Sequence, residues 1–317
     1  MKRNFISLFM AVTVTLICCN ITFATGNNEY PNGIEGIKAA SVPPPGFYYK
    51  MYNVIYSADS SIDKDGKENV GLKDFSLNLF ANAHRFLLVS KKKFLGASLG
   101  ADIIIPLMNV DLEVSPKGLP FTIADNEFAP GDICFEPLVM AWHGSQYDLA
   151  FAAGFYAPTG KYSLNSDVNP GKGMWTGMFT FGGTVYFDKG KTWSASALSR
   201  YEIHGEKDVL VLNNLTDVYE KKKTTPGNDY HIEWGFAKTI AKIVDVGISG
   251  YCQWQTTRDT GQGKPGEDKD RVYAVGPEIS IFVPPLMTNF NLRALWEFEA
   301  KDRTEGVFVS LVYTKIF

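Results

Sequence analysis

Apolar and polar side chains alternate along most of the chain after residue 46. In residues 244–257, VDVGISGYCQWQTT, valine, isoleucine, cysteine and tryptophan occupy one set of alternate positions, while aspartate, serine, tyrosine and glutamine occupy the other. Residues 289–300 repeat the pattern, with phenylalanine, leucine and tryptophan opposite asparagine, arginine and glutamate. Side chains of a β-strand point to its two faces in turn, so each segment is predicted to be a strand with one apolar and one polar face.

Twelve segments of this kind follow one another, and most of them are 10 to 15 residues long. Strands of soluble proteins usually have about five or six residues, whereas a tilted strand that crosses a bilayer needs about 9 to 11. The length therefore favours membrane-spanning strands. The predicted strands are 47–56, 75–89, 94–107, 132–142, 147–156, 175–187, 192–204, 229–240, 244–257, 272–282, 289–300 and 306–317.

The connections between these segments alternate in length. Short turns are predicted at 90–93, 143–146, 188–191, 241–243 and 283–288, and long loops at 57–74, 108–131, 157–174, 205–228 and 258–271, with 301–305 a short exception. This alternation is typical of outer-membrane barrels, with turns in the periplasm and loops outside. We predict an all-β fold, a transmembrane antiparallel up-and-down β-barrel of about 12 strands with both termini periplasmic. A secreted sandwich would instead hide its apolar faces in a core.

If the apolar faces contact lipid, the polar faces line a lumen. The charged side chains on these faces either shape a selective pore or pair with one another across neighbouring strands. For individual residues we favour pairing, in which Arg200 and Arg293 contact Glu202, Glu233, Glu297 or Glu299. The predicted lumen residues are Asp102, Glu136, Arg200, Glu202, Glu233, Gln253, Gln255, Glu278, Arg293, Glu297 and Glu299, with Asn78, Asn82, His84, His204, His231 and Tyr251 counted on the same faces.

Aromatic side chains near the strand ends are expected to lie at the membrane–water boundary, because a barrel is expected to have no conventional core. They are Trp142, Trp175, Trp193, Trp234, Tyr48, Tyr147, Tyr156, Tyr186 and Tyr230.

The beginning of the chain has the form of a secretory signal peptide. Two basic residues precede the apolar run 5–19, and Thr22 and Ala24 supply the small residues of a cleavage site after residue 24. Residues 25–46, which include three consecutive prolines, are predicted to be a periplasmic segment that either hangs free or folds into the barrel as a plug. Residues 47–317 are predicted to form the barrel.

The last residues, VFVSLVYTKIF, continue the alternating pattern to the final phenylalanine. Phe317, Tyr313 and Leu311 fall on one face, and an aromatic residue at the end of such a strand is the form read by the outer-membrane barrel assembly machinery. The same strand is predicted to pair with residues 47–56, because a closed barrel leaves no exposed edge.

Charge and cysteine content narrow the function. Without residues 1–24 the chain has 29 basic and 34 acidic residues, a net charge of −5, which gives no case for nucleic-acid binding. Cys134 shares the inward face of Glu136, and Cys252 shares the lipid face of Val246. Side chains on opposite faces do not approach closely enough for a disulfide, so we predict two free thiols.

Catalytic and metal-binding motifs are not apparent. No His-x-x-x-His or Cys-x-x-Cys sequence, the spacings that would suggest a metal site, occurs after residue 24. The run DKDGKE at residues 63–68 resembles the start of a calcium loop, but its twelfth position is Asp74 and no helices flank it, which favours a solvated loop. We expect no enzyme activity, no catalytic residue, no metal and no cofactor.

Several short motifs together resemble the outer-membrane protein family named for the meta-pathway of phenol degradation. They are PPPG at 43–46, FEP at 135–137, AWH at 141–143, APTGKY at 157–162, NPGKG at 169–173, WSASA at 193–197, GYCQWQ at 250–255 and GPE at 276–278. Cys252 stands where an aromatic residue is expected, which leaves the predicted fold unchanged.

The resemblance implies an outer-membrane channel that passively admits small hydrophobic or aromatic compounds, with outer-membrane lipid and the assembly machinery as its other partners. The long loops 108–131 and 157–174 would be able to fold inward and control passage. Two alternatives stay open: a structural or adhesive barrel with a plugged lumen, and, less favoured, a barrel enzyme. These patterns do not distinguish an open from a plugged lumen, and they fix neither the solute nor the oligomeric state.

Overall fold

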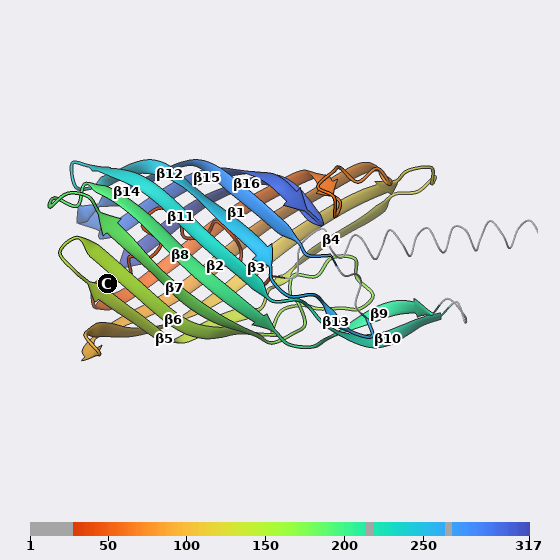
Figure 1. The fold of residues 1–317 in the computed structure, drawn as a ribbon, viewed down its shortest axis with the longest axis horizontal. Coiled ribbons are helices and arrows are strands. Elements are labelled where there is room, and N and C mark those ends of the chain that lie inside the picture. Colours follow the sequence, from red (N-terminus) through yellow and green to blue (C-terminus); the bar gives the residue numbers. More distant parts are fainter. Residues whose placement is uncertain (1–27, 214–217, 264–267) are drawn as a thin grey trace, which may run out of the picture.

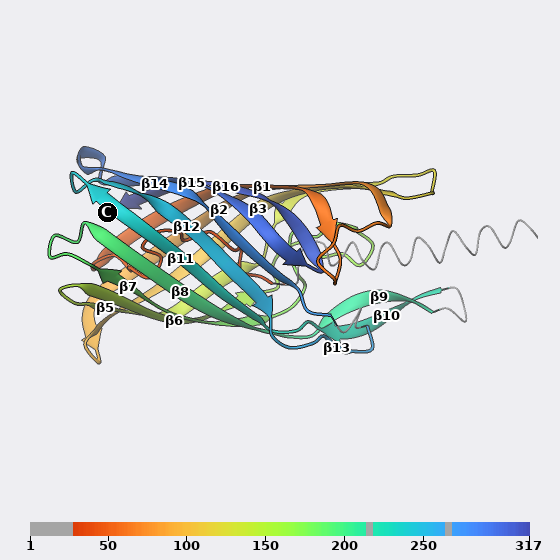
Figure 2. The same cartoon turned by 45° about the horizontal axis from the view of Figure 1, so that its top comes forward.

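A computed structural model describes residues 28–213, 218–263 and 268–317, so the predicted signal peptide lies outside the described residues. Its long strands form a closed antiparallel barrel, as predicted (Figures 1 and 2). Nowhere in these ranges is a helix long and apolar enough to cross a membrane. The barrel strands are β1 (Gly46–Ile62), β2 (Leu72–Phe94), β3 (Ala97–Pro116), β5 (Ile133–His143), β6 (Tyr147–Ala157), β7 (Thr176–Tyr186), β8 (Trp193–His204), β11 (Asp229–Ile240), β12 (Val244–Gln255), β14 (Arg271–Val283), β15 (Thr288–Lys301) and β16 (Arg303–Ile316).

The barrel closes where its first and last strands meet. β1 pairs with β2 on one side and with β16 on the other, with Tyr52 opposite Val312 in the second pair. The backbone N–H of Phe317 donates to the carbonyl of Phe47, and their ring centroids lie 5.5 Å apart. The predicted pairing of the last strand with the first is therefore confirmed.

Two predicted loops contain further strands. β3 continues to Pro116 and pairs with β4 (Ile123–Pro130), while β9 (Lys207–Asn213), β10 (Val218–Thr225) and β13 (Thr260–Gly261) form a small separate sheet. Both features project beyond the barrel at the end that carries the long loops, here called the loop end (Figures 1 and 2). Much of the loop 108–131 thus extends outward as strands rather than folding inward, and residues 207–213 and 218–225 also extend outward as strands.

The first tight turn lies later than predicted. Residues 90–93 belong to β2, and the chain turns at Leu95 and Gly96, which have φ values of 50° and 80°. A two-residue hairpin turn of this kind needs positive φ at both central residues, a condition that glycine meets without strain. The three lysines therefore extend the strand at the opposite end of the barrel, here called the turn end.

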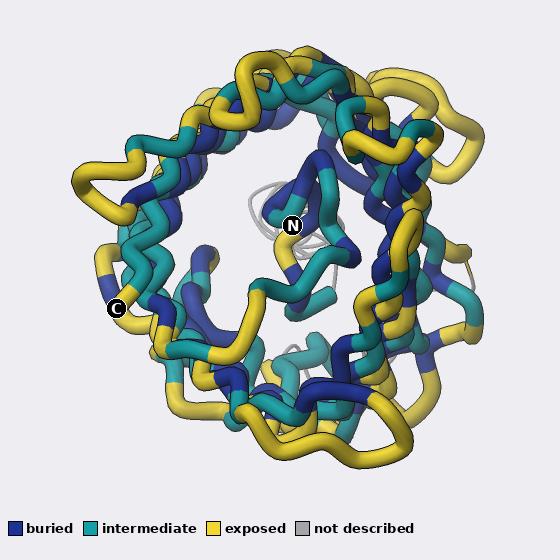
Figure 3. The backbone as a smooth tube through the Cα atoms, turned by 90° about the vertical axis from the view of Figure 1, so that its left-hand side faces the viewer, coloured by how far each residue is buried: buried dark blue, intermediate teal, exposed yellow. Residues whose placement is uncertain are grey.

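Residues 28–45, here called the lumen segment, lie inside the barrel (Figure 3). The segment begins at the loop end, where the Tyr30 N–H donates to Glu202, and reaches the turn end, where the Ser41 hydroxyl donates to Asp148. The first described residue therefore lies in the lumen rather than at the turn end, where the C-terminus lies (Figure 1).

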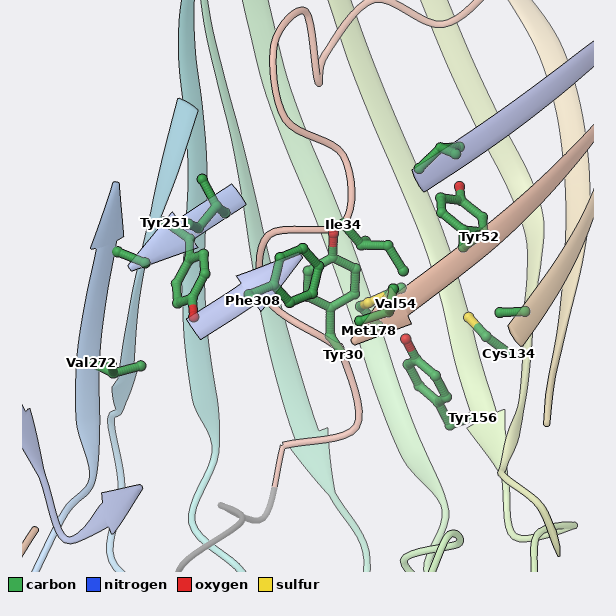
Figure 4. Packing of buried hydrophobic residues seen from close by; sticks show 14 of the residues in the cluster. Tyr30, Ile34, Tyr52, Val54, Cys134, Tyr156, Met178, Tyr251, Val272 and Phe308 are labelled. Carbon is green, nitrogen blue, oxygen red and sulfur yellow. The ribbon is translucent and has the colours of Figure 1, made fainter. Parts of the chain in front are cut away.

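The lumen segment completes a hydrophobic cluster inside the barrel. Tyr30 and Ile34 pack with Tyr52, Tyr251 and Phe308, which point inward from the wall (Figure 4). The expectation that the barrel has no core is therefore wrong. Part of the predicted aromatic boundary is also wrong, because Tyr48, Tyr156 and Tyr186 are buried inside, whereas Trp175, Trp193 and Tyr147 are exposed on the outer face.

Candidate functional site

Most of the predicted lumen residues lie in the barrel interior, where each is at most 9% exposed. Among the further residues counted on the same faces, His204, His231 and Tyr251 are buried there as well. The ten main candidates placed inside are Asp102, Glu136, Arg200, Glu202, Glu233, Gln253, Gln255, Glu278, Arg293 and Glu297.

Glu299 does not lie in the lumen, because a bulge interrupts the alternation of β15. Tyr273 pairs with Phe298 and Arg271 with Lys301, so β15 has one more residue than β14 between these pairs. Glu299 occupies the irregular position with a φ of 55°, and its side chain is 69% exposed. An extra residue in one strand reverses the face of everything beyond it, which a strict period of two cannot anticipate.

The predicted faces of β2 are reversed. Asn78, Asn82 and His84 point outward and bond to side chains of β1, as His84 Nδ1 does with the Tyr49 hydroxyl at 2.7 Å. Arg85 points inward instead, together with the buried residues Leu77, Ala83 and Leu87. On this strand the inward face is largely apolar, so assigning the more polar face to the lumen gave the wrong answer.

Glu233 of β11 is the main anchor of the lumen segment. One carboxylate oxygen accepts hydrogen bonds from the Tyr30 hydroxyl and from the N–H groups of Gly33 and Ile34, at 3.1 and 3.3 Å for the last two. The other accepts from the N–H groups of Glu35 and Gly36, at 2.8 and 3.3 Å. Gly33 and Gly36 have φ values of 81° and 64°, and such a left-handed backbone lets successive N–H groups converge on one anion.

A second anchor joins β14 and β15 to the same segment. Glu278 accepts a hydrogen bond from the Ile37 N–H at 2.9 Å, and Arg293 donates to the Gly33 carbonyl at 2.6 Å. Glu278 and Arg293 also form an ion pair at 3.3 Å. Arg293 therefore pairs with a different acid from those predicted. Nearer the turn end, Lys38 pairs with Asp245 at 2.7 Å.

Glu35 belongs to the lumen segment, and its carboxylate lies at the centre of a cluster of charged side chains from the wall. Its oxygens lie 3.1 Å from Lys50 Nζ, 2.6 Å from Arg85 Nη1 and 3.8 Å from Arg200 Nη2. Burial alone would raise the pKa of Glu35, but the three cations hold that pKa well below its usual range. The group is therefore ionised at neutral pH in the docked segment.

The wall completes this charge cluster. Arg85 also contacts Asp102 at 2.5 Å and Glu136 at 3.1 Å, and Arg200 lies 4.0 Å from Glu233. The Arg200 guanidinium stacks on the Tyr30 ring at 3.9 Å, which adds a cation–π contact to the docked segment. Arg200 thus pairs with Glu233, one of the predicted partners.

A cavity of about 240 Å³ remains beside the charge cluster, toward the turn end. Its charged lining residues are Glu35, Lys50, Arg85, Glu136 and Arg200. Its apolar lining residues include Leu87, Val139, Ala150, Ala152 and Leu198. The lumen is therefore not completely filled by the segment.

A hydrogen-bonded network lies at the loop end of the lumen. His204 Nε2 is 2.9 Å from Asp229, His231 Nε2 is 2.9 Å from Glu202, and His204 Nδ1 is 3.0 Å from the Thr176 hydroxyl. Within the described ranges, Glu202, His204 and Asp229 form the one group whose geometry could hold a metal ion. Both ring nitrogens of His204 have protein partners, and Glu202 pairs with His231, so hydrogen bonds to neighbouring side chains account for the arrangement of this group.

The two thiols lie as predicted. Cys134 is buried in the internal cluster, Cys252 is partly exposed on the opposite face of its strand, and neither forms a disulfide. The predicted pair of free thiols is confirmed.

Three charged residues of the site were not predicted: Lys50, Arg85 and Glu35. Lys50 is the only charged residue in 47–56, and Arg85 is the only one in 75–89. A solitary cation in a membrane strand is costly on the lipid face, so it must point inward. That signal would have identified both cations and corrected the faces of β2, whereas the docking of Glu35 had no signal in the alternation.

Comparison with known proteins agrees with this architecture. The model of the family described as "Putative MetA-pathway of phenol degradation" matches residues 58–313. Among solved structures, the COG4313 outer membrane channel from Pseudomonas putida F1 has a TM-score of 0.73 at 13% identity and covers 91% of this chain and 100% of its own. The β domain of the Bordetella autotransporter BrkA has a TM-score of 0.50 at 10% identity, with 86% and 100% covered.

These structural similarities show the outer-membrane barrel fold. A sequence search of curated proteins finds no significant match. The family match covers most of the barrel, and the chain belongs to the putative MetA-pathway of phenol degradation family.

Proposed function

We propose that this protein is an outer-membrane channel that passively admits small hydrophobic or aromatic compounds and that its lumen segment is the gate. The turn end and the C-terminus then face the periplasm, and the long loops face outward. Export by a cleaved signal peptide, insertion by the assembly machinery and contact of the apolar outer face with lipid belong to the same proposal. The family description and the similar channel from Pseudomonas putida support it.

The observation that carries this proposal is the way in which the segment is held. Its backbone is fixed chiefly by side chains of the wall, with Glu233 and Glu278 accepting from its N–H groups and Arg293 donating to a carbonyl. No strand of the barrel pairs with residues 28–45. The segment can therefore leave the lumen without breaking the barrel sheet, whereas removing a paired strand would open it.

A reversible cross-link tests the gate. The hydroxyl oxygens of Ser41 and Thr184 lie 2.9 Å apart, so cysteines at both positions are within reach of a disulfide. The double variant is made in a chain with Cys134 and Cys252 replaced by serine and reconstituted in liposomes. We expect phenol uptake to fall on oxidation and to recover on reduction, while the serine-only chain is indifferent to both. Equal uptake by the locked and reduced forms would reject the gate.

The alternative of a structural or adhesive barrel has one observation in its favour. The β3–β4 hairpin and the β9–β10–β13 sheet extend beyond the barrel at the loop end and offer surface to a partner (Figure 2). This alternative requires a permanently closed lumen. The same liposomes distinguish the two, because a permanently closed barrel admits no phenol even after reduction.

We infer that the protein is not an enzyme. The hydrogen bond that the enzyme hypothesis needs does exist, between the Thr176 hydroxyl and His204. However, Thr176 is completely buried and His204 is 5% exposed, so a substrate cannot reach the hydroxyl. The pair is better explained as part of the loop-end network. Absence of hydrolysis of ester and amide substrates by the folded barrel would agree, and activity that Thr176→Val abolishes would contradict this inference.

A further inference from the structure

The carboxylate of Glu35 occupies a binding site that is built by the barrel wall. Its three cations, Lys50, Arg85 and Arg200, come from β1, β2 and β8, and their charged groups converge on this carboxylate inside the lumen. The carboxylate itself belongs to the lumen segment, and its side chain is 10% exposed. The wall therefore presents a preformed site for one carboxylate, and a part of the same chain fills that site.

Removing this carboxylate affects the cations unequally. Arg85 keeps Asp102 and Glu136, and Arg200 keeps its contact with Glu233. Lys50 has no other carboxylate within ion-pair distance in the described part of the chain. A buried charge that loses its partner is strongly destabilising, so the emptied site would favour another anion in the same place.

The cavity beside this site supplies space for the rest of a ligand. Its volume of about 240 Å³ exceeds the roughly 150 Å³ of an apolar cavity that holds benzene. Leu87, Val139 and Leu198 give part of its lining an apolar surface. Thr180, also in the lining, is buried and its hydroxyl has no hydrogen-bond partner. The cavity therefore fits one aromatic ring with a short substituent.

We propose that the lumen binds small monoaromatic carboxylates, with the ligand carboxylate replacing that of Glu35 among Lys50, Arg85 and Arg200 and the ring in the adjoining cavity. Glu35 then acts as an internal competitor that must leave before the solute binds. Guanidinium and ammonium groups bind carboxylates by charge-assisted hydrogen bonds, which a hydrocarbon of the same shape cannot form. The inference rests on the proposed channel function, since the segment has to move to admit the ligand.

Binding to the purified, folded barrel in detergent tests this site without requiring passage. The probe is benzoate, measured by isothermal titration calorimetry, with toluene as the uncharged ligand of similar shape. We expect Glu35→Gln to bind benzoate at least about tenfold more tightly than the wild type, because an occupied site lowers apparent affinity by the fraction that is free. The affinity for toluene should change much less.

Two matched variants separate the site from general loosening of the segment. Lys38→Gln removes the ion pair with Asp245 and weakens docking without touching the cations of the site. It should not reproduce the tenfold gain for benzoate. Lys50→Met in the Glu35→Gln chain removes one cation and should cancel the gain.

The proposal is overturned if Glu35→Gln and the wild type bind benzoate equally, or if Lys38→Gln gives the same gain. Should Glu35→Gln fail to fold, Lys50→Met alone decides: benzoate binding must weaken about tenfold relative to toluene binding, and an equal loss for both rejects the site. Failure of the channel is distinguishable, because liposomes would then exclude phenol while benzoate still bound in detergent.

Discussion

Glu233→Gln tests whether one buried charge holds the lumen segment in place. The carboxylate accepts five hydrogen bonds, three at one oxygen and two at the other. Glutamine has the same shape but carries an NH₂ group in place of one oxygen, and this group cannot accept from an N–H. Whichever way the amide is oriented, at least two donors of the segment lose their acceptor.

The magnitude follows from these lost bonds. Leaving a buried donor unsatisfied costs about 1 to 3 kcal/mol, so two donors give about 2 to 4 kcal/mol if water relieves part of the penalty. At 1.4 kcal/mol for each factor of ten, the ratio of docked to released segment should fall about 30-fold to 700-fold. The loss of charge also removes the ion-pair partner of Arg200 at 4.0 Å.

Single-channel recording in planar bilayers measures this ratio as the fraction of time spent conducting. The matched control is Glu297→Gln, because Glu297 is also buried and accepts from the Tyr56 and Tyr251 hydroxyls and the Gly306 N–H, all of which belong to the wall. We expect Glu233→Gln to conduct far more often than the wild type and the control to change little. Equal effects of both variants would mean that conduction reflects barrel stability and would refute this account of the gate.

Three further predictions concern the same structure. Glu35 has a lowered pKa when docked, so its contribution to docking is complete above the unfolded pKa of about 4.3 and is lost only as the pH falls further. Channel conductance that depends on Glu35 should therefore be constant from pH 8 to 5 and rise in stronger acid. A Glu35→Gln channel with the same acid response would contradict this prediction. A Cβ at Gly36 would lie 2.2 Å from Glu278 Oε2, and the φ of Gly36 is 64°, so Gly36→Ala should release the lumen segment and expose it to protease. Gly118 lies on an exposed loop where a Cβ would have nothing within 4 Å, so Gly118→Ala should not change protease sensitivity. Phe317→Ala removes the ring that contacts Phe47 and should reduce the amount of heat-modifiable folded barrel in the outer membrane. Normal assembly of this variant would argue against the assembly signal formed with Tyr313 and Leu311.

The barrel was predictable because lipid imposes one simple rule on every strand. An apolar outer face and long segments follow from the need to satisfy the backbone inside a bilayer. The strands, their order and their closure could therefore be inferred from the alternation of side chains, the alternating lengths of the connections and the absence of free edges in a barrel. The errors arose where this rule does not act. Beyond the bilayer, water satisfies both faces, which is why β4, β9 and β10 had no clear pattern and the three lysines of β2 were mistaken for a turn.

The interior of the lumen was predicted less well, because the positions of its residues depend on contacts with particular partners rather than on contact with lipid. Alternation placed Glu233 and Glu278 inside the barrel but could not indicate that both bind the backbone of residues 33–37. It failed at Glu299, where one extra residue reverses the faces, and on β2, where Leu77 and Leu87 make the inward face apolar.

The sequence of the wall nevertheless contains one indication that a segment occupies the lumen. Glu233 stands opposite Leu198 on β8 and Tyr251 on β12, so neither directly paired position supplies a cation. Glu278, in contrast, stands opposite Arg293 on β15. A carboxylate at membrane depth needs a partner, and Glu233 obtains most of its partners from the N–H groups of the lumen segment. Two features of a sequence therefore predict that a segment docks inside the barrel. One is an inward-facing acid with no cation at the paired positions, and the other is a glycine-containing segment before the first strand.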